Sequence, residues 1–493
     1  MEMNKVFKDG LWSKEINVSD FVYTNITPYE GDASFLAGPT ERTKKVWNEC
    51  LKALEEERAN NGVRSLDNVT VSTITSHKAG YIDRENELIV GLQTDELLRR
   101  AIKPYGGIKV VEKACHENGV EVDEKVKDIF THYRKTHNDG VFDAYTEEIR
   151  SFRSLGFLTG LPDNYARGRI IGDYRRLALY GIDRLIEAKQ EDLRNITSPM
   201  TDARIRLREE VAEQIKALKE IKILGEYYGL DLSRPATNAQ EAVQWVYMAY
   251  LAAVKEQDGA AMSLGNVSSF LDIYIQYDLD HGKIDESFAQ ELVDQFIIKL
   301  RMVRHLRMQS YNDIFAGDPT WVTESLGGRF NDGRTKVTKT SFRFLQTLYN
   351  LGPSPEPNLT VLWSPELPEG FKEFCAKVSI DTSSIQYEND DLMREVRNSD
   401  DYGIACCVSY QDIGRHIQFF GARCNLAKAL LLAINGGRCE NTGTLMVRDI
   451  PALSGDVLNF EEVLANYKKV LKEMARVYNE AMNICLLYTS DAA

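Results

Sequence analysis

Two neighbouring cysteines, followed by an arginine, are the residues of this sequence whose types and spacing point most directly to chemistry. Cys406 and Cys407 lie in the apolar run of residues 404–408, and Arg423 follows them. Adjacent Cα atoms are about 3.8 Å apart across a trans peptide, whereas a disulfide usually needs roughly 4.4 to 6.8 Å. Because a bridge between the two would be strained, we expect two free thiols.

The sequence around the cysteine pair predicts that the two thiols point in opposite directions. Residues 404–408 have the apolar, β-branched character of a short buried strand or of its end. Successive side chains of an extended chain point to opposite faces, so one thiol would face a substrate and the other a group behind it. That arrangement suits a two-step relay. The simpler interpretation, two cysteines packed as small hydrophobic residues, stays open from the pair alone.

Arg423 lies where an anion is favoured. The helix expected after it begins behind Asn425, a typical N-cap residue, and stops at residues 435–437, Asn-Gly-Gly. Free N–H groups and the helix dipole favour an anion at such an N-terminus, and a guanidinium binds a carboxylate through two hydrogen bonds. An ion pair at the surface is the alternative. The expected apolar face of the helix contains Leu426, Ala429, Leu430 and Ala433.

Composition excludes several classes of function. The chain has 493 residues, a net charge of −14 and a pI near 5.2, which disfavour binding to nucleic acid or to an anionic membrane. No run of about 18 apolar residues occurs, and the first residues lack a signal peptide, so we expect a cytoplasmic protein. The eight cysteines show neither a CxxC motif nor zinc-ligand spacing, and no metal site is expected.

The remaining elements predict a mixed α/β fold. A helix is expected from Thr40 to residues 61–62, with Trp47, Cys50, Leu51 and Leu54 as its buried stripe. Three helices are expected between residues 201 and 310, where Leu207, Val211, Ile215, Leu218 and Leu224 share one face. Strands are expected at residues 69–74, 359–363 and 378–380. Helices that alternate with short apolar strands favour an α/β fold with a buried sheet.

Several stretches of the sequence together resemble the pyruvate formate-lyases (formate C-acetyltransferases) of the glycyl radical enzyme family. Residues 404–409 read Ile-Ala-Cys-Cys-Val-Ser, and residues 418–423 read Gln-Phe-Phe-Gly-Ala-Arg. Further matching stretches lie at residues 160–163, 168–176 and 352–358. The likeness runs from about residue 11 to about residue 484, which makes it highly specific.

The resemblance implies a ten-stranded α/β barrel built from two half-barrels, with the cysteines on a loop that reaches inside. It also implies that Arg169 and Arg423 hold the carboxylate of pyruvate. The other implied pocket residues are Phe420, Trp321, Phe315 and Ala260. Judged by sequence alone, each arginine of residues 167–176 is more often an ion-pair partner, and the adjacent Arg175 and Arg176 cannot both face one pocket.

The resemblance further implies a radical mechanism. A radical stored on a glycine oxidises Cys407, which passes the radical to Cys406. Cys406 then adds to the carbonyl of pyruvate, the C–C bond breaks, formate leaves, and coenzyme A takes the acetyl group from Cys406. This chemistry belongs to anaerobic glucose fermentation and needs no metal or prosthetic group. The implied partners are a radical S-adenosylmethionine activating enzyme and, for the full-length protein, a second copy of the chain.

The sequence also departs from the family pattern. No Arg-Val-Ser-Gly-Tyr type motif, which carries the radical glycine, occurs in the 493 residues. We therefore expect a pyruvate formate-lyase domain at residues 1–484 with an incomplete barrel, no glycyl radical domain, and an unrelated tail at residues 485–493. Such a C-terminally truncated chain would be inactive alone. Cys424 stands where an alanine is typical and adds a third thiol beside Arg423.

Other functions stay open. Within the superfamily, the alternatives are a 2-ketobutyrate formate-lyase, another glycyl radical lyase or a diol dehydratase, although the aromatic wall and both arginines favour a 2-keto acid. A polar enzyme would use a cysteine nucleophile with His416 as its base, but that leaves the second cysteine unexplained. A non-catalytic fragment that dimerises or binds the activating enzyme is the third possibility.

Overall fold

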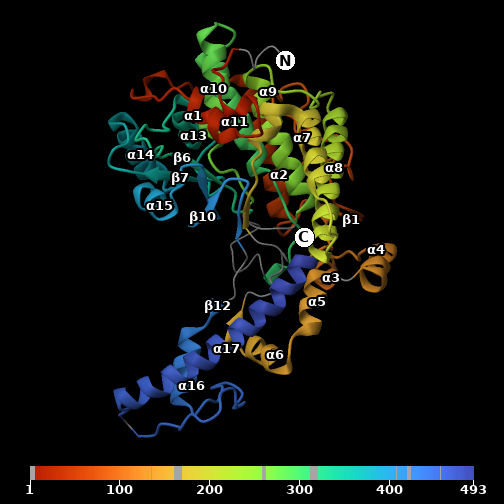
Figure 1. The fold of residues 1–493 in the computed structure, drawn as a ribbon, viewed down its shortest axis with the longest axis vertical. Coiled ribbons are helices and arrows are strands. Elements are labelled where there is room, and N and C mark those ends of the chain that lie inside the picture. Colours follow the sequence, from red (N-terminus) through yellow and green to blue (C-terminus); the bar gives the residue numbers. More distant parts are fainter. Residues whose placement is uncertain are drawn as a thin grey trace. The chain divides into compact units, whose positions relative to one another are not determined.

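The computed structural model in Figure 1 describes the chain as two compact units. Residues described are 6–134, 136–159, 169–257, 262–310, 320–406, 408–418, 423–455 and 457–492. The larger unit comprises Met1–Lys103, Val111–Asp123 and Arg169–Gln418, and the smaller unit comprises Pro104–Val110, Glu124–Gly168 and Phe419–Ala493. Each unit has its own hydrophobic core.

Long helices build the core of the larger unit (Figure 1). Helix α9 contacts α7, α8, α10 and α11, and it is buried around most of its circumference, as expected for a helix that is apolar on nearly all sides. Asn238 caps α9 and Thr338 caps α13, each by accepting a backbone N–H in the first turn. The helices are α1 (Val18–Asn25), α2 (Glu41–Ala59), α7 (Arg175–Asn195), α8 (Asp202–Tyr227), α9 (Ala239–Glu256), α10 (Val267–Asp280), α11 (Glu286–Arg301), α13 (Lys339–Asn350), α14 (Glu369–Thr382) and α15 (Asp390–Arg397).

The strands of the larger unit form short sheets beside these helices. Strands β6 (Thr323–Gly327), β7 (Asn358–Trp363) and β8 (Ile385–Asn389) are parallel, and α13 and α14 connect them in the manner of βαβ units. A second sheet pairs β4 (Arg169–Ile171) with β5 (Met262–Ser263) and β11 (Ile417–Gln418). Strands β1 (Ser65–Val71) and β2 (Arg99–Ile102) pair in parallel, and β9 (Tyr402–Ala405) and β10 (Ser409–Asp412) form an antiparallel hairpin.

The smaller unit packs helices around a second core. Its helices are α4 (Glu124–Asp128), α5 (His137–Ala144), α6 (Glu147–Ser154), α16 (Leu426–Ile434) and α17 (Phe460–Ala492), and its strands β3 (Leu158–Thr159) and β12 (Arg423–Cys424) pair with each other. Helix α3 (Ile108–Glu117) has residues in both units. Val470, Val477 and Cys485 of α17 are buried in the second core together with Leu432 of α16.

The predicted mixed α/β fold is confirmed in its coarse form. The described strands lie in five separate sheets of two or three strands, and a closed ten-stranded barrel is not seen among the described residues. The strand expected at residues 359–363 is β7, and the expected strand at residues 69–74 overlaps β1, which ends at Val71. Among the described helices, none has the length and apolarity that crossing a membrane requires.

Four sequence-based expectations need correction. Residues 378–380 are not a strand, because they continue the amphipathic turn pattern of α14, with Val378 buried and Ile380 exposed. The buried stripe of α2 is Val46, Cys50 and Ala53, so Leu51 points to solvent. Helix α16 buries Ala429, Leu432 and Ala433, whereas Leu426 and Leu430 are exposed. On the expected face of α8, Val211, Ile215 and Leu224 are buried but Leu207 is exposed.

Candidate active site

Cys406 lies at the tip of the β9–β10 hairpin. Ser409 pairs with Ala405 at the last rung of the ladder, and Cys406 directly follows Ala405. The backbone of Cys406 is left-handed, with φ of 65°, and its residue surface is only 3% exposed. The sequence predicts a short buried strand or the end of one at residues 404–408, and the structure shows the end: β9 stops at Ala405 and the chain turns at Cys406. The prediction that the two thiols point to opposite faces required an extended backbone at Cys406, so it loses its basis. Cys407 lies outside the described residues.

The backbone of Cys406 is held by side chains of three other strands. Its N–H donates to Ser263 Oγ of β5 at 3.2 Å. Its carbonyl oxygen accepts from Thr323 Oγ1 of β6 at 2.6 Å and from Asn358 Nδ2 of β7 at 3.3 Å. These bonds satisfy buried backbone groups that the β9–β10 ladder does not reach. Two residues before Cys406, the N–H of Ile404 in β9 donates to Ser325 Oγ at 3.0 Å.

A close backbone approach brings β9 against the chain between β5 and β6. A Cβ atom at Gly403 would lie 2.7 Å from the Cα of Gly265, a distance that real Cβ atoms do not reach. Gly265 in turn bridges to Glu324 of β6. Glycine at residue 403 is thus required for the hairpin to reach the hydroxyl groups of Ser263, Thr323 and Ser325.

Sequence reasoning missed these hydroxyl residues, although the sequence holds a signal for them. Strand β6 is buried along its whole length, and a parallel strand buried on both faces is normally apolar. Residues 323–325, Thr-Glu-Ser, break that rule. A polar run inside a buried strand marks the place where another segment needs hydrogen-bond partners.

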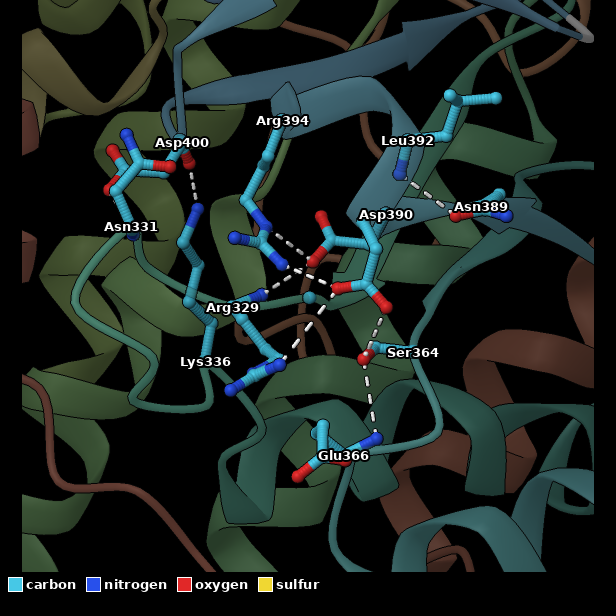
Figure 2. Close-up of polar contacts among 12 residues, drawn as sticks. Arg329, Asn331, Lys336, Ser364, Glu366, Asn389, Asp390, Leu392, Arg394 and Asp400 are labelled. Atoms are coloured by element: carbon cyan, nitrogen blue, oxygen red, sulfur yellow. Dashed lines mark hydrogen bonds and ion pairs between the residues drawn. The ribbon is translucent and has the colours of Figure 1, made fainter. Parts of the chain in front are cut away.

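Asp390, which lies between Arg329 and Arg394 in Figure 2, anchors the other end of the hairpin. Its carboxylate accepts from the hydroxyl of Tyr402, the first residue of β9, at 2.6 Å. The same carboxylate accepts from Arg394 Nε at 2.8 Å and from the backbone N–H of Arg329 at 3.0 Å. Arg394 also pairs with Asp391 at 2.6 Å. Because Asp390 is fully buried, these partners are what make its charge tolerable.

A second buried charge cluster fixes residues 400–401, just before β9. Arg175 donates to both carboxylate oxygens of Asp401, at 3.0 and 3.1 Å, and to Asp173 at 2.7 Å. Burial opposes the ionisation of Arg175 and Asp401, yet the attraction between the charges prevails: the pKa of Arg175 is raised and the pKa of Asp401 is lowered. Lys336 donates to the carbonyl of Asp400 (Figure 2), and burial lowers the pKa of its ammonium.

Arg175 and Arg176 behave as their sequence predicts. Arg175 is buried between two aspartates, whereas the side chain of Arg176 is 38% exposed and pairs with Asp173. Both are therefore ion-pair partners, as the sequence alone favours for the arginines of this stretch.

Trp321 shares a partner with Cys406. Ser263 Oγ, which accepts from the N–H of Cys406, donates to the carbonyl of Trp321 at 3.4 Å. The backbone of Trp321 is left-handed, with φ of 47°, and its N–H donates to the carboxylate of Glu356. Burial raises the pKa of Glu356. Of the predicted pocket residues, Trp321 is thus the one that the described part of the chain connects to Cys406.

The remaining predicted site residues are described only in part. Arg169 opens β4, whose residue Ile171 pairs with Ser263 of β5, so its strand adjoins the strand that supports Cys406. Arg423 opens β12 in the smaller unit and is exposed, and the predicted cap of Asn425 on α16 is confirmed. Ala260, Phe315 and Phe420 lie outside the described residues, like Cys407.

The polar alternative with His416 as a base receives no support. His416 Nδ1 lies 3.0 Å from Asp412 Oδ2, and the imidazole is 60% exposed. Asp412 pairs with Tyr402 at the end of the hairpin opposite to Cys406. Three residue steps of about 3.4 Å separate that end from the last rung of the ladder. A base at this end is too far from the Cys406 thiol to take its proton directly.

The left-handed backbone of Cys406 predicts an unusual order of stability among its variants. We expect Cys406→Gly to be more stable than Cys406→Ala by about 1 kcal/mol, because only glycine adopts this conformation without a steric cost. The measurement is the free energy of unfolding from urea titration. In an extended strand, the alanine variant would be the more stable one, and that order would contradict the conformation described.

The smaller unit contains a thiol, that of Cys439, whose pKa is lowered, in contrast to those of Cys115 and Cys424. Lys428 Nζ of α16 lies 3.1 Å from the Sγ of Cys439 and 2.8 Å from the carboxylate of Glu440. A hydrogen bond from Thr442 and the Lys428 ammonium lower the pKa of Cys439 to about 7. Burial instead raises the pKa of Cys115 to about 11 and also raises that of Cys424.

We expect Cys439 to be alkylated with its own pH dependence. The thiolate is the reactive form, so the rate of iodoacetamide labelling at Cys439 rises through a midpoint near its pKa of about 7. Lys428→Met removes the ammonium and moves the midpoint upward, toward about 8.5. Peptide mapping across pH 5 to 10 measures both, with Cys115 as the internal reference. If Cys439 and Cys115 were labelled with the same pH midpoint, the lowered pKa of Cys439 would be contradicted.

Comparison with known structures places this architecture in a known class. The chain superposes on the B12-independent glycerol dehydratase of Clostridium butyricum with a TM-score of 0.77, 20% identity, and coverage of 94% of this chain and 66% of that one. A glycyl radical enzyme from Archaeoglobus fulgidus matches with a TM-score of 0.68, 17% identity, and coverage of 92% and 63%. At these identities the likeness concerns the fold, which is the one these enzymes share.

Residues 11–492 match the family described as pyruvate formate lyase-like, and the chain belongs to that family. It is 55% identical over 492 residues to a formate acetyltransferase of Haemophilus influenzae. The match covers 98% of this chain and 64% of that protein, so the chain spans a little under two thirds of the length of this relative. The family resemblance stated from residues 404–409 and 418–423 is confirmed.

Proposed function

We propose that a protein carrying this chain is a formate acetyltransferase, which converts pyruvate and coenzyme A to acetyl-coenzyme A and formate by radical chemistry. The observation that carries the proposal is Cys406: a buried cysteine in a left-handed backbone at a hairpin tip, fixed by Ser263, Thr323 and Asn358. Sterically costly backbone held in place by its surroundings is typical of functional sites. The 55% identity to the Haemophilus protein supports this activity.

In the proposed reaction, the Cys406 thiyl radical forms a C–S bond to C2 of pyruvate. The C1–C2 bond then breaks, which leaves an acetyl thioester on Cys406 and a formate radical anion. That anion takes a hydrogen atom from a thiol and becomes formate, and the thiol becomes the next thiyl radical. Coenzyme A attacks the thioester, so that acetyl-coenzyme A leaves and the Cys406 thiol is restored. The buried hairpin tip suits this sequence, because water and oxygen are kept from the sulfur.

The finer parts of the proposal rest on the family resemblance. Cys407 relays the radical from a glycine, and a radical S-adenosylmethionine enzyme installs it. Arg169 and Arg423 hold the carboxylate of pyruvate and stabilise the departing anion. The pocket wall comprises Phe420, Trp321, Phe315 and Ala260, within a ten-stranded barrel. The protein acts as a cytoplasmic homodimer. The partner that Trp321 shares with Cys406 supports its place in the wall.

The test is an anaerobic assay of a protein that carries this chain. After treatment with an activating enzyme and S-adenosylmethionine, electron spin resonance measures the radical, and formate and acetyl-coenzyme A are quantified with pyruvate as substrate. We expect a radical signal and equal amounts of the two products. A protein that carries the radical but releases no formate from pyruvate would overturn the proposal.

A further inference from the structure

We propose that Thr323 and Asn358 are positioning residues that fix the direction of the Cys406 side chain, an inference that rests on the proposed function. Both donate to the same carbonyl oxygen, that of Cys406. A carbonyl oxygen has two lone pairs, so these two donors occupy its full accepting capacity. Neither residue touches the substrate in this proposal; both act through Cys406.

The two donors are held in register with each other. Thr323 is the first residue of β6 and Asn358 the first residue of β7, and they are direct partners in the parallel ladder. The side chain of Thr323 is fully buried and β-branched, which restricts its χ1 rotation. On the opposite face of β6, the Glu324 carboxylate accepts the N–H groups of Val267 and Ser268 at the start of α10. The donors thus belong to a sheet edge that is itself anchored.

Together with Ser263, the donors hold Cys406 on both sides of its Cα. Ser263 binds the N–H of Cys406, and Thr323 and Asn358 bind its carbonyl. With both peptide planes fixed, the direction of the Cα–Cβ bond is fixed as well, and the sulfur is left with one rotation, χ1. The ladder of β9 and β10 ends at Ala405, so it does not supply this constraint.

The constraint matters because radical addition needs a short, aligned approach. Reacting atoms must come within about 3 to 3.5 Å, and a misplacement of about 1 Å can lower a rate about 10²-fold. The left-handed backbone of Cys406 is unfavourable by itself, so loss of a donor lets the residue relax away from the observed geometry. The sulfur would then move without any change in the pocket that binds pyruvate.

The activity test compares Thr323→Val, which removes the hydroxyl but keeps the shape, with Thr323→Ser, which keeps the hydroxyl. In an active protein carrying this chain, we expect Thr323→Val to lower kcat roughly 10- to 100-fold, with KM for pyruvate unchanged within about two-fold, and Thr323→Ser to restore most of kcat. Asn358→Leu lowers kcat in the same manner. Thr347→Val is the matched control, because its hydroxyl is also buried and donates to a carbonyl, that of Phe344, without contacting Cys406.

A stability cycle tests the same claim without any activity. In the original background, Cys406→Gly unfolds at a higher temperature than Cys406→Ala. In the Thr323→Val background we expect this difference in Tm to shrink by at least half, because residue 406 is no longer held in the left-handed region. In the Thr347→Val background the difference remains.

The two measurements separate failure of this inference from failure of the proposed function. An unchanged Tm difference in the Thr323→Val background, or an active enzyme whose kcat is the same for Thr323→Val and Thr347→Val, would overturn the positioning role. If the Tm difference shrinks in the Thr323→Val background but the radical-bearing protein releases no formate, the positioning role is supported and the proposed reaction is rejected.

Discussion

Replacing Cys406 with alanine is expected to abolish formate release from pyruvate. In the proposed reaction Cys406 carries the acetyl group, and no other described thiol is placed at the hairpin tip. Removal of a covalent nucleophile lowers rates on the order of 10⁴-fold or more. The measurement is the initial rate of formate production after anaerobic activation, normalised to the radical content of each sample.

Cys50→Ala is the control for the loss of a buried thiol. Cys50 is fully buried on α2, and burial raises its pKa to about 12, so it stays a neutral packing residue at physiological pH. We expect this variant to unfold more easily but to keep its rate per radical. If Cys406→Ala retained more than a few per cent of the rate, the covalent role of Cys406 would be wrong.

Arg175→Met is expected to lower the free energy of unfolding by about 3 to 5 kcal/mol. The side chain of Arg175 is 2% exposed and lies between the buried Asp173 and the partly buried Asp401, and both carboxylates would lose its charge. Arg184→Met, on the exposed part of the same helix α7, removes an arginine paired with Glu187 and should cost less than about 1 kcal/mol. Urea titration of the three proteins at pH 7 measures both effects.

The pH dependence of the free energy of unfolding tests the role of Arg175 in a second, independent way. Arg175 lowers the pKa of Asp401 in the folded protein, so the pair stabilises the fold above the carboxylate's ordinary pKa and this contribution is lost as the pH falls. In the variant, Asp401 loses this counter-charge, which favours its protonation. The loss in free energy of unfolding caused by Arg175→Met should therefore become smaller as the pH is lowered from 7 to 4.5. A deficit that grew on acidification would contradict the ionic role of the cluster.

Local sequence signals predicted elements whose determinants lie close together in the chain. Helix α2 begins after Thr40 and α16 after its N-cap Asn425, as expected, because a helix start depends mainly on the residues of the first turn. The run of residues 359–363 is β7, since a buried β-branched run needs little context. The same reasoning failed at residues 378–380, where a short apolar run fits a helix face equally well.

The geometry of the candidate site could not be predicted in that way. The left-handed turn at Cys406 depends on Thr323 and Asn358, which precede it by 83 and 48 residues, and on Ser263, 143 residues before it. No local rule favours a cysteine in that conformation. The proposal that Cys406 is the chemical centre comes from residue type and family resemblance, whereas the backbone conformation of Cys406 depends on tertiary hydrogen bonds.

The most direct test of the account is to find where the acetyl group resides during the reaction. An activated protein carrying this chain would be mixed anaerobically with ¹³C-labelled pyruvate in the absence of coenzyme A, quenched in acid and mapped by tandem mass spectrometry. The account predicts a labelled acetyl thioester on Cys406, which disappears when coenzyme A is added before the quench. A label on another cysteine, or formate release with no labelled cysteine at all, would contradict it.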